Sequence, residues 1–275
     1  MISSFPFRRL VLAAMVALPV GLAPVAEALA HRAWMMPSAT VLSGNDPWVT
    51  VDAAISNDLF YFEHFPMPLD GLTVTGPDGR AVTVENQSRG RYRSTFDFRL
   101  TEPGTYRASV AAEGMSATWR QGGEQRRWRG TREAFATAVP QGAEQLRVTL
   151  SQRRNEIFVT RGAPSERVLQ PINEGLEMVA ITHPNDLVAG EPARFRLMLD
   201  GRPAGGVDVE VVPGGNRYRD ALNDQKIKTG ADGVFEIRWG GPGMHWVSAS
   251  VRDDNSGIAG VQRNASYAAT LEVLP

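Results

Sequence analysis

The segments Val188–Val212, VAGEPARFRLMLDGRPAGGVDVEVV, and Thr229–Val251, TGADGVFEIRWGGPGMHWVSASV, decide the fold of this chain. Apolar and polar residues alternate in both segments, as at Phe195, Leu197 and Leu199, and Gly, Pro and Asp separate the alternating runs. Alternation with a period of two is typical of half-buried β-strands. We therefore predict a succession of strands joined by tight turns.

The first half of the chain repeats this pattern. Alternating apolar residues occur at Val49–Ile55, Phe96–Leu100 and Tyr106–Val110, and turn formers such as GPDG at Gly76–Gly79 separate the runs. Only residues 131–138 favour a helix. The sequence therefore predicts an all-β fold of immunoglobulin-like or transthyretin-like β-sandwiches with one short helical insertion.

A polar segment divides the strand pattern into two parts. Arg161–Gly175 is rich in Pro, Gly and polar residues and has no apolar period, so we interpret it as a linker. We predict an N-terminal β-sandwich domain over residues 31–165 and a C-terminal one over 166–275. The arginine-rich stretch Trp119–Arg129, WRQGGEQRRWR, is interpreted as a solvated loop.

The first 30 residues have the layout of a secretory signal. Arg8 and Arg9 precede an apolar run from Leu10 to about Val25, and small residues follow. This run is shorter than the roughly 20 residues that a membrane-spanning helix needs. We expect residues 1–30 to be a cleaved signal peptide, so that the mature chain has no membrane span and lies in the periplasm.

The composition limits the chemistry that the mature chain can carry. Cysteine is absent, which excludes disulfides and thiolate ligands and fits a bacterial periplasm. The formal net charge of −1 gives no indication of a nucleic-acid partner. The sequence has no nucleophile elbow, phosphate-binding loop or dinucleotide fingerprint. A transition-metal site must therefore draw on four histidines, on carboxylates or thioethers, or on the N-terminal amine.

Signal cleavage determines what His31 can bind. Cleavage after Ala30 makes His31 the first residue, so that its α-amine and imidazole can ligate one metal as half of a histidine brace. Cleavage after Ala28 makes it the third residue, where the amine, two amides and the imidazole form a square-planar set for Cu(II) or Ni(II). The alternative is that His31 is only a polar residue that the peptidase tolerates.

His64 lies in the stretch Asp58–Met67, DLFYFEHFPM, which we predict to be a strand. Phe60, Phe62 and His64 would share one face of that strand. His64 is then either a ligand held by an aromatic wall or a residue at the edge of the core.

The two remaining histidines have similar alternatives. His183 precedes Pro184 at a predicted turn, where it is either a loop residue bonded to Asp186 or a ligand at the domain junction. His245 begins a predicted strand, and we expect it to point outward or to the rim while Trp246 points into the core.

The mature chain resembles the periplasmic family catalogued as domain of unknown function 4198. The resemblance is carried by HRAWMMPSA at the mature start, SNDLFYFEHFPM at Ser56–Met67, NEIFVTRGAPS at Asn155–Ser165, and the stretch Leu176–Val209. It implies a secreted β-rich protein associated with nickel or cobalt uptake. The turn TGADG at Thr229–Gly233 also makes the C-terminal part similar to transthyretin-like and carboxypeptidase-regulatory-like sandwiches.

These observations favour a binding protein over an enzyme. We expect a periplasmic protein that binds Ni, Co or Cu through His31, His64, His183 and His245 and takes part in metal uptake or delivery, with a membrane uptake system as its partner. One alternative is a structural or protein-binding sandwich without metal. Another is a copper oxidase built on a histidine brace.

Overall fold

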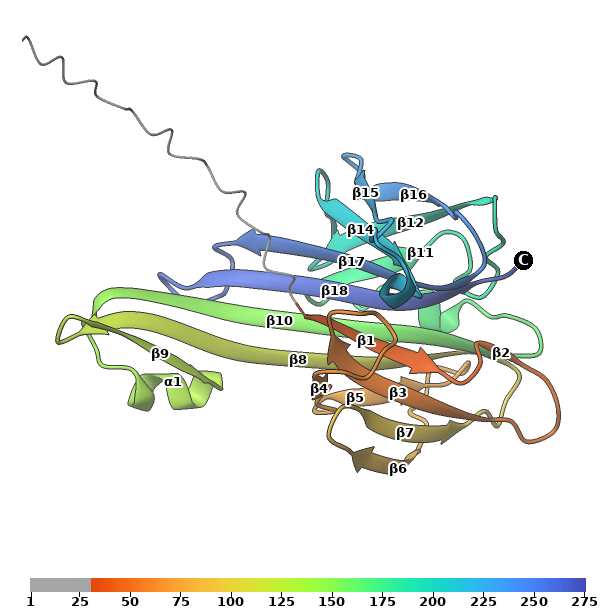
Figure 1. The fold of residues 1–275 in the computed structure, drawn as a ribbon, viewed down its shortest axis with the longest axis horizontal. Helices are drawn as coiled ribbons and strands as arrows, with labels where there is room; N and C mark the ends of the chain where they lie inside the picture. Colours follow the sequence, from red (N-terminus) through yellow and green to blue (C-terminus); the bar gives the residue numbers. More distant parts are fainter. Residues whose placement is uncertain (1–30) are drawn as a thin grey trace, which may run out of the picture. The chain divides into compact units, whose positions relative to one another are not determined.

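The alternating sequence forms β-strands throughout residues 31–275, the part of the chain that the computed structural model describes (Figure 1). The predicted signal peptide and its two cleavage sites lie outside these residues. The strands are β1 (Arg32–Pro37), β2 (Val41–Leu42), β3 (Trp48–Ser56), β4 (Phe65–Pro66), β5 (Leu72–Thr75), β6 (Val84–Arg89), β7 (Ser94–Arg99), β8 (Gly104–Gln121), β9 (Glu124–Gly130), β10 (Glu144–Arg161), β11 (Leu176–Ala180), β12 (Pro192–Leu199), β13 (Arg202–Pro203), β14 (Asp208–Pro213), β15 (Gln225–Lys228), β16 (Val234–Arg238), β17 (Gly243–Asp253) and β18 (Gln262–Val273). The prediction of an all-β sandwich fold is confirmed.

Helices are few and short in this part of the chain. The helix α1 spans Arg132–Ala138, where the sequence favours a helix, and the side chain of Thr131 caps its N-terminus. Two 3-10 turns, η1 (Arg167–Leu169) and η2 (Asn216–Tyr218), complete the set. Among the described residues, no helix is long and apolar enough to cross a membrane.

The strands form three sheets (Figure 1). A five-stranded sheet has the order β1-β3-β7-β6, with β4 paired to β3, and a four-stranded sheet has the order β11-β12-β13, with β16 paired to β12. The largest sheet has the order β15-β14-β17-β18-β10-β8-β5, and β2 and β9 pair with β10 and β8.

Two apolar cores pack against this largest sheet. Phe96, Phe98 and Tyr106 are buried in the core of the N-terminal part, and Phe195 and Phe235 in that of the C-terminal part. The largest sheet runs without a break from one core to the other, because β10 of the N-terminal part pairs in parallel with β18 of the C-terminal part. The two largest cores thus share one sheet, and the division into domains at residue 165 stays a prediction.

The stretch Trp119–Arg129 is a hairpin, so its interpretation as a solvated loop is wrong. β8 and β9 pair through this stretch, with Gln121 opposite Glu124. Gly122 and Gly123 connect them with φ values of 59° and 83°. Positive φ at both central residues is the requirement of the type I′ turns that favour hairpins. The Gly-Gly pair was therefore the signal for two strands.

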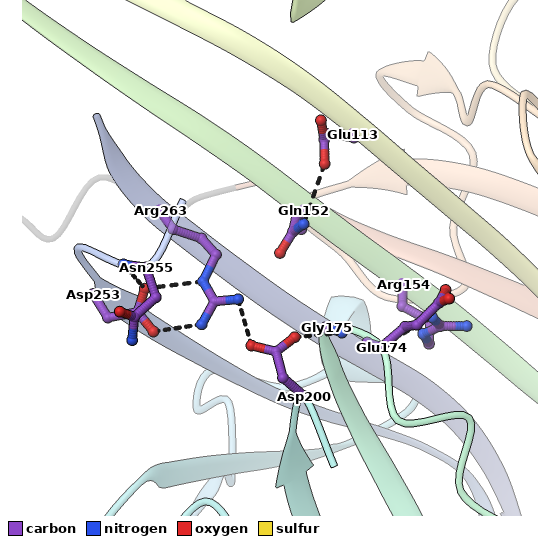
Figure 2. A network of polar contacts seen from close by, with 9 residues as sticks. All are labelled: Glu113, Gln152, Arg154, Glu174, Gly175, Asp200, Asp253, Asn255 and Arg263. Atoms are coloured by element: carbon purple, nitrogen blue, oxygen red, sulfur yellow. Dashed lines mark hydrogen bonds and ion pairs between the residues drawn. The ribbon is translucent and has the colours of Figure 1, made fainter. Parts of the chain in front are cut away.

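A buried guanidinium joins the edge of the C-terminal core to the largest sheet (Figure 2). Arg263 in β18 is 4% exposed. It donates to both carboxylate oxygens of Asp253 in β17, at 2.9 and 2.6 Å, and to Asp200 at 2.6 Å. Hydrogen bonds from Arg263 hold the pKa of Asp253 below its usual value. The arginine is thus paired on both sides, as a buried charge requires.

Replacing Arg263 by Ala should destabilise the protein strongly. R263A deletes three hydrogen bonds between charged groups, and Asp200 and Asp253 remain partly exposed, so water replaces some of the lost interaction and we expect a net loss of about 2–4 kcal/mol. Urea unfolding of R263A would measure this loss. The control is R238A, which breaks the exposed pair with Glu236 and should cost less than about 1 kcal/mol. Equal losses in the two variants would contradict the prediction.

Candidate metal centre

Two of the four histidines lie together at one end of β3. His31 directly precedes β1, whose first residue, Arg32, is opposite Ser56. His64 directly precedes β4, where Phe65 is opposite Ile55. The strand pairing therefore brings both histidines to the same end of β3. Their ring centroids are 4.3 Å apart, with an angle of 65° between the rings.

His64 lies on a loop, so the prediction of a strand through this segment is wrong. Residues 57–64 form turns and bends between β3 and β4, and Phe60 has a φ of 62°, which does not fit a strand. Glu63 Oε1 accepts hydrogen bonds from the backbone N–H groups of Asn57 and Asp58, at 2.8 and 2.9 Å. The carboxylate thus satisfies two donors that a strand would have paired with a neighbour.

Aromatic side chains of this loop pack against β1. Phe60 and Phe62 both contact Trp34 of β1, at centroid distances of 5.4 and 5.6 Å. Trp34 is 1% exposed and donates through Nε1 to Ser56 at 2.7 Å. Phe60 and Phe62 thus pack on Trp34, whereas the aromatic rings beside His64 are those of His31 and the exposed Phe65, 6.2 Å away.

The C-terminal half of the chain holds the loop in place. Asn216 of η2 accepts the backbone N–H of Leu59 at 2.9 Å and donates to Asp58 at 3.1 Å. Arg217 lies 3.7 Å from the carboxylate of Asp58 and 3.7 Å from the ring centre of Tyr61. No local sequence pattern predicts this support, because Asn216 follows a Gly-Gly turn and its partners Asp58 and Leu59 are remote in the sequence.

One ring nitrogen at the site has no partner. His64 Nε2 is buried and makes no hydrogen bond within residues 31–275; the nearest carboxylate oxygen, Glu63 Oε1, is 3.7 Å away. A buried polar atom normally has a partner, and an unprotonated imidazole nitrogen is a good ligand for a transition metal. His31 is exposed beside it. The two imidazoles are of the type that binds a transition metal, and an ion would reach Nε2 of His64 only after this nitrogen becomes accessible.

The side chains at this place do not complete a metal site by themselves. Nowhere in the described part of the chain do three or more His, Asp or Glu side chains gather as they would around a metal. The pair His31 and His64 supplies two imidazoles. A third nitrogen at this place would have to come from the α-amine of His31, if the mature chain begins there.

His183 lies in a different environment, where both of its ring nitrogens are engaged. Nδ1 accepts the backbone N–H of Asn185 at 3.1 Å, so Nε2 carries the proton and donates to Thr105 Oγ1 at 2.9 Å. Burial lowers the pKa of His183. The neutral ring has no lone pair left for a metal in this arrangement.

His245 is buried, so the expectation that it points outward or to the rim is wrong. It is 3% exposed, and its ring lies 5.1 Å from that of Trp239 in the C-terminal core. Nδ1 donates to the carbonyl oxygen of Gly243 at 3.0 Å. Trp246 does point the other way, into a cluster with Trp34. The alternation was predicted correctly, but both faces of β17 are covered here.

The chain matches one known protein family over most of its length. The sequence profile described as "Domain of unknown function (DUF4198)" matches residues 28–253. The chain belongs to this family. The matched region contains all four histidines of the described residues, and the family description names no activity.

The chain is also distantly similar to some proteins of known structure. No curated protein matches the sequence. The chain is similar to the D0-D1 domain of intimin, at 14% identity and a TM-score of 0.22, covering 88% of this chain and 97% of that one. It is also similar to Escherichia coli alpha-2-macroglobulin activated by porcine elastase, at 12% identity and a TM-score of 0.24. That match covers 89% of this chain and 20% of the macroglobulin.

The support from η2 can be tested without any metal. In N216A the N–H of Leu59 loses its acceptor. Because one hydrogen bond stabilises the folded loop by about 1 kcal/mol, this amide should exchange its hydrogen roughly fivefold faster in the variant. Residue-resolved hydrogen exchange measures this. The exposed Asn45 offers a matched control, N45A, which should leave Leu59 unchanged. Unchanged exchange in N216A would show that Asn216 does not hold the loop.

The burial of His245 predicts a pH dependence of stability. Burial lowers the pKa of His245 below its usual value, so the unfolded chain takes up a proton before the folded chain does. Stability should therefore fall as the pH drops below about 6.5. H245Q should lose part of this dependence, measured as urea midpoints at about pH 7.5 and about pH 5.5. An identical dependence in H245Q and the wild type would argue against this burial effect.

Proposed function

We propose that the protein binds a transition-metal ion at its mature N-terminus and serves metal uptake or delivery in the periplasm. One observation carries the proposal: the rings of His31 and His64 lie 4.3 Å apart, although 33 positions separate them in the sequence. Two imidazoles at this distance are close enough for each to place one nitrogen on the same metal ion. The unpartnered Nε2 of His64 supports the same conclusion.

The donor set favours cleavage after Ala30. The α-amine and imidazole of His31, together with the imidazole of His64, would give three nitrogen ligands, the set of a histidine brace. Cleavage after Ala28 would instead give His31 a complete square-planar set of its own, and the contact with His64 would then have no function. Nitrogen ligands accept Cu, Ni and Co alike, with copper favoured by intrinsic affinity.

The proposed metal site consists of His31 and His64, and His183 and His245 are not part of it. The two latter rings are hydrogen-bonded inside the protein, whereas His31 is exposed and open to exchange with a partner. Exposure of a ligand suits a protein that passes its metal on, and the partner would be a membrane metal-uptake system. The transthyretin-like character of residues 166–275 belongs to the proposal as well, with a structural role.

Calorimetric titration of Cu(II) and Ni(II) into the mature protein tests the proposal. We expect one ion per chain, with an affinity that falls as the pH drops, because the imidazoles and the amine must be unprotonated to bind. H31A and H64A should each weaken binding by more than the roughly 10- to 100-fold that loss of an outer hydrogen-bond partner costs. H183Q and H245Q are the matched controls and should bind as the wild type does.

Four further results would contradict the proposal in different ways. Undiminished binding by H64A would exclude the brace arrangement. Undiminished binding by a chain with one additional glycine before His31 would exclude the α-amine as a ligand. Absence of binding in the wild type would favour the alternative of a structural module. Peroxide formation by the copper-loaded protein with a reductant would instead favour the copper oxidase.

A further inference from the structure

One face of the largest sheet is uncovered along five neighbouring strands, β9, β8, β10, β18 and β17 (Figure 1). Met115, Trp119 and Leu150 lie on the opposite face, in a core that Phe135 of α1 helps to cover. Because side chains alternate between the two faces of a strand, the residues between them point the other way. Strand pairing extends this second face, which we call the arginine face, to Ala112, Gly114, Ser116, Thr118 and Arg120 of β8; Gln125, Arg127 and Arg129 of β9; Arg147, Thr149, Ser151 and Arg153 of β10; Gln262, Asn264 and Ser266 of β18; and Ser250 and Arg252 of β17. None of these residues is buried.

The arginine face carries six arginines that have no acidic partner. Within residues 31–275, none of these six forms an ion pair: Arg120, Arg127, Arg129, Arg147, Arg153 and Arg252. The acid in β9 pairs with another arginine, since Glu124 lies 3.1 Å from Arg126. Two acids border the face: Glu144 is opposite Arg120, and Asp254 follows β17. The face is therefore positively charged as a whole, whereas protein surfaces usually mix both signs.

Strand pairing places several of these arginines close together. Arg127 and Arg147 are both opposite Thr118, on strands that lie about 10 Å apart on either side of it. Arg129 follows Arg127 by two residues, about 7 Å along β9. These distances are within the screening length of about 10 Å at 0.1 M salt, so the charges repel one another. An anionic partner over the face would be attracted by all of them and would remove this repulsion.

The other residues of the arginine face indicate which anionic partner fits. None of its residues is aromatic, whereas single-stranded nucleic acids usually stack their bases on aromatic rings. None is large and apolar, whereas protein interfaces centre on such anchors. The arginines are also spread from β9 to β17, about 19 Å across the sheet, which is too wide for one small anion. These features favour a broad surface of negative charge as the partner.

We propose that the arginine face docks on the surface of a bilayer that contains anionic phospholipids. Each basic side chain near such a surface strengthens binding roughly fivefold, and neither a pocket nor an apolar anchor is needed, because lipid headgroups move laterally to meet the charges. The formal net charge of the chain, −1, does not oppose this contact, since only charges within about 10 Å of the membrane act on it at 0.1 M salt. His31 and His64 are not part of the face, so the proposal does not depend on the metal centre.

Sedimentation with lipid vesicles tests this proposal, using the mature protein without added metal. We expect the protein to bind vesicles that contain phosphatidylglycerol and not vesicles of phosphatidylcholine alone. The bound protein should dissociate at about 1 M salt, where the screening length falls to roughly 3 Å. Equal binding to both kinds of vesicle, or binding that survives the salt, would overturn the proposal. Binding to tripolyphosphate or to duplex DNA without binding to the vesicles would identify a different anionic partner and would overturn it as well.

Three triple variants with equal numbers of substitutions locate the contact. R127Q/R129Q/R147Q removes three charges from the face and should bind the phosphatidylglycerol vesicles roughly 100-fold more weakly. R126Q/R132Q/R238Q removes three charges elsewhere, from exposed arginines that pair with glutamates, and should weaken binding less than about fivefold.

The third variant, R127K/R129K/R147K, keeps the charge of the face and should bind as the wild type does. A site that holds one phosphate in a guanidinium fork would instead lose affinity on this change. Equal losses in the two glutamine variants, or a loss in the lysine variant, would overturn the proposal.

Discussion

Hydrogen bonding between β8, β10 and β18 holds the two halves of the chain together. β10 pairs with β8 on one side and with β18 on the other, so its backbone is satisfied along most of its length. Ile157 and Val159 enter the N-terminal core from one face, while Phe158 enters the C-terminal core from the other. A strand buried on both faces carries a continuous apolar run, and this run is IFV. Neither core could close without it.

The candidate metal centre depends on the ends of strands rather than on their middles. His31 and His64 each precede a strand that pairs with the end of β3, and the C-terminal half supplies the residues that hold the loop between them. The site thus combines an exposed ligand position, His31, with one on a loop that hydrogen bonds hold in place, His64. Such a combination suits a protein that must bind an ion and also release it.

The sequence predicted the strands well and the loops poorly. Alternation at Val49–Ile55 and Tyr106–Val110 identifies strands because one face meets a core. The same alternation at Phe60, Phe62 and His64 does not indicate a strand. Phe60 and Phe62 lie on a turn, and both rings contact Trp34. Residue types alone identified all four histidines as candidates. Their separation into one pair and two rings that are hydrogen-bonded elsewhere depends on pairings between distant strands, which no local pattern contains.

The parallel pairing of β10 with β18 also constrains how the chain can fold. Thr149 pairs with Gln262, so most of one edge of β10, all but the end that β2 covers, has no partner until nearly all of the chain is available. Contacts between residues so distant in sequence form slowly, because the intervening chain must first be ordered. During this interval an 18-residue strand exposes unpaired N–H and C=O groups, a template for aggregation. A protein of this architecture is therefore expected to benefit from a chaperone until its last strand docks.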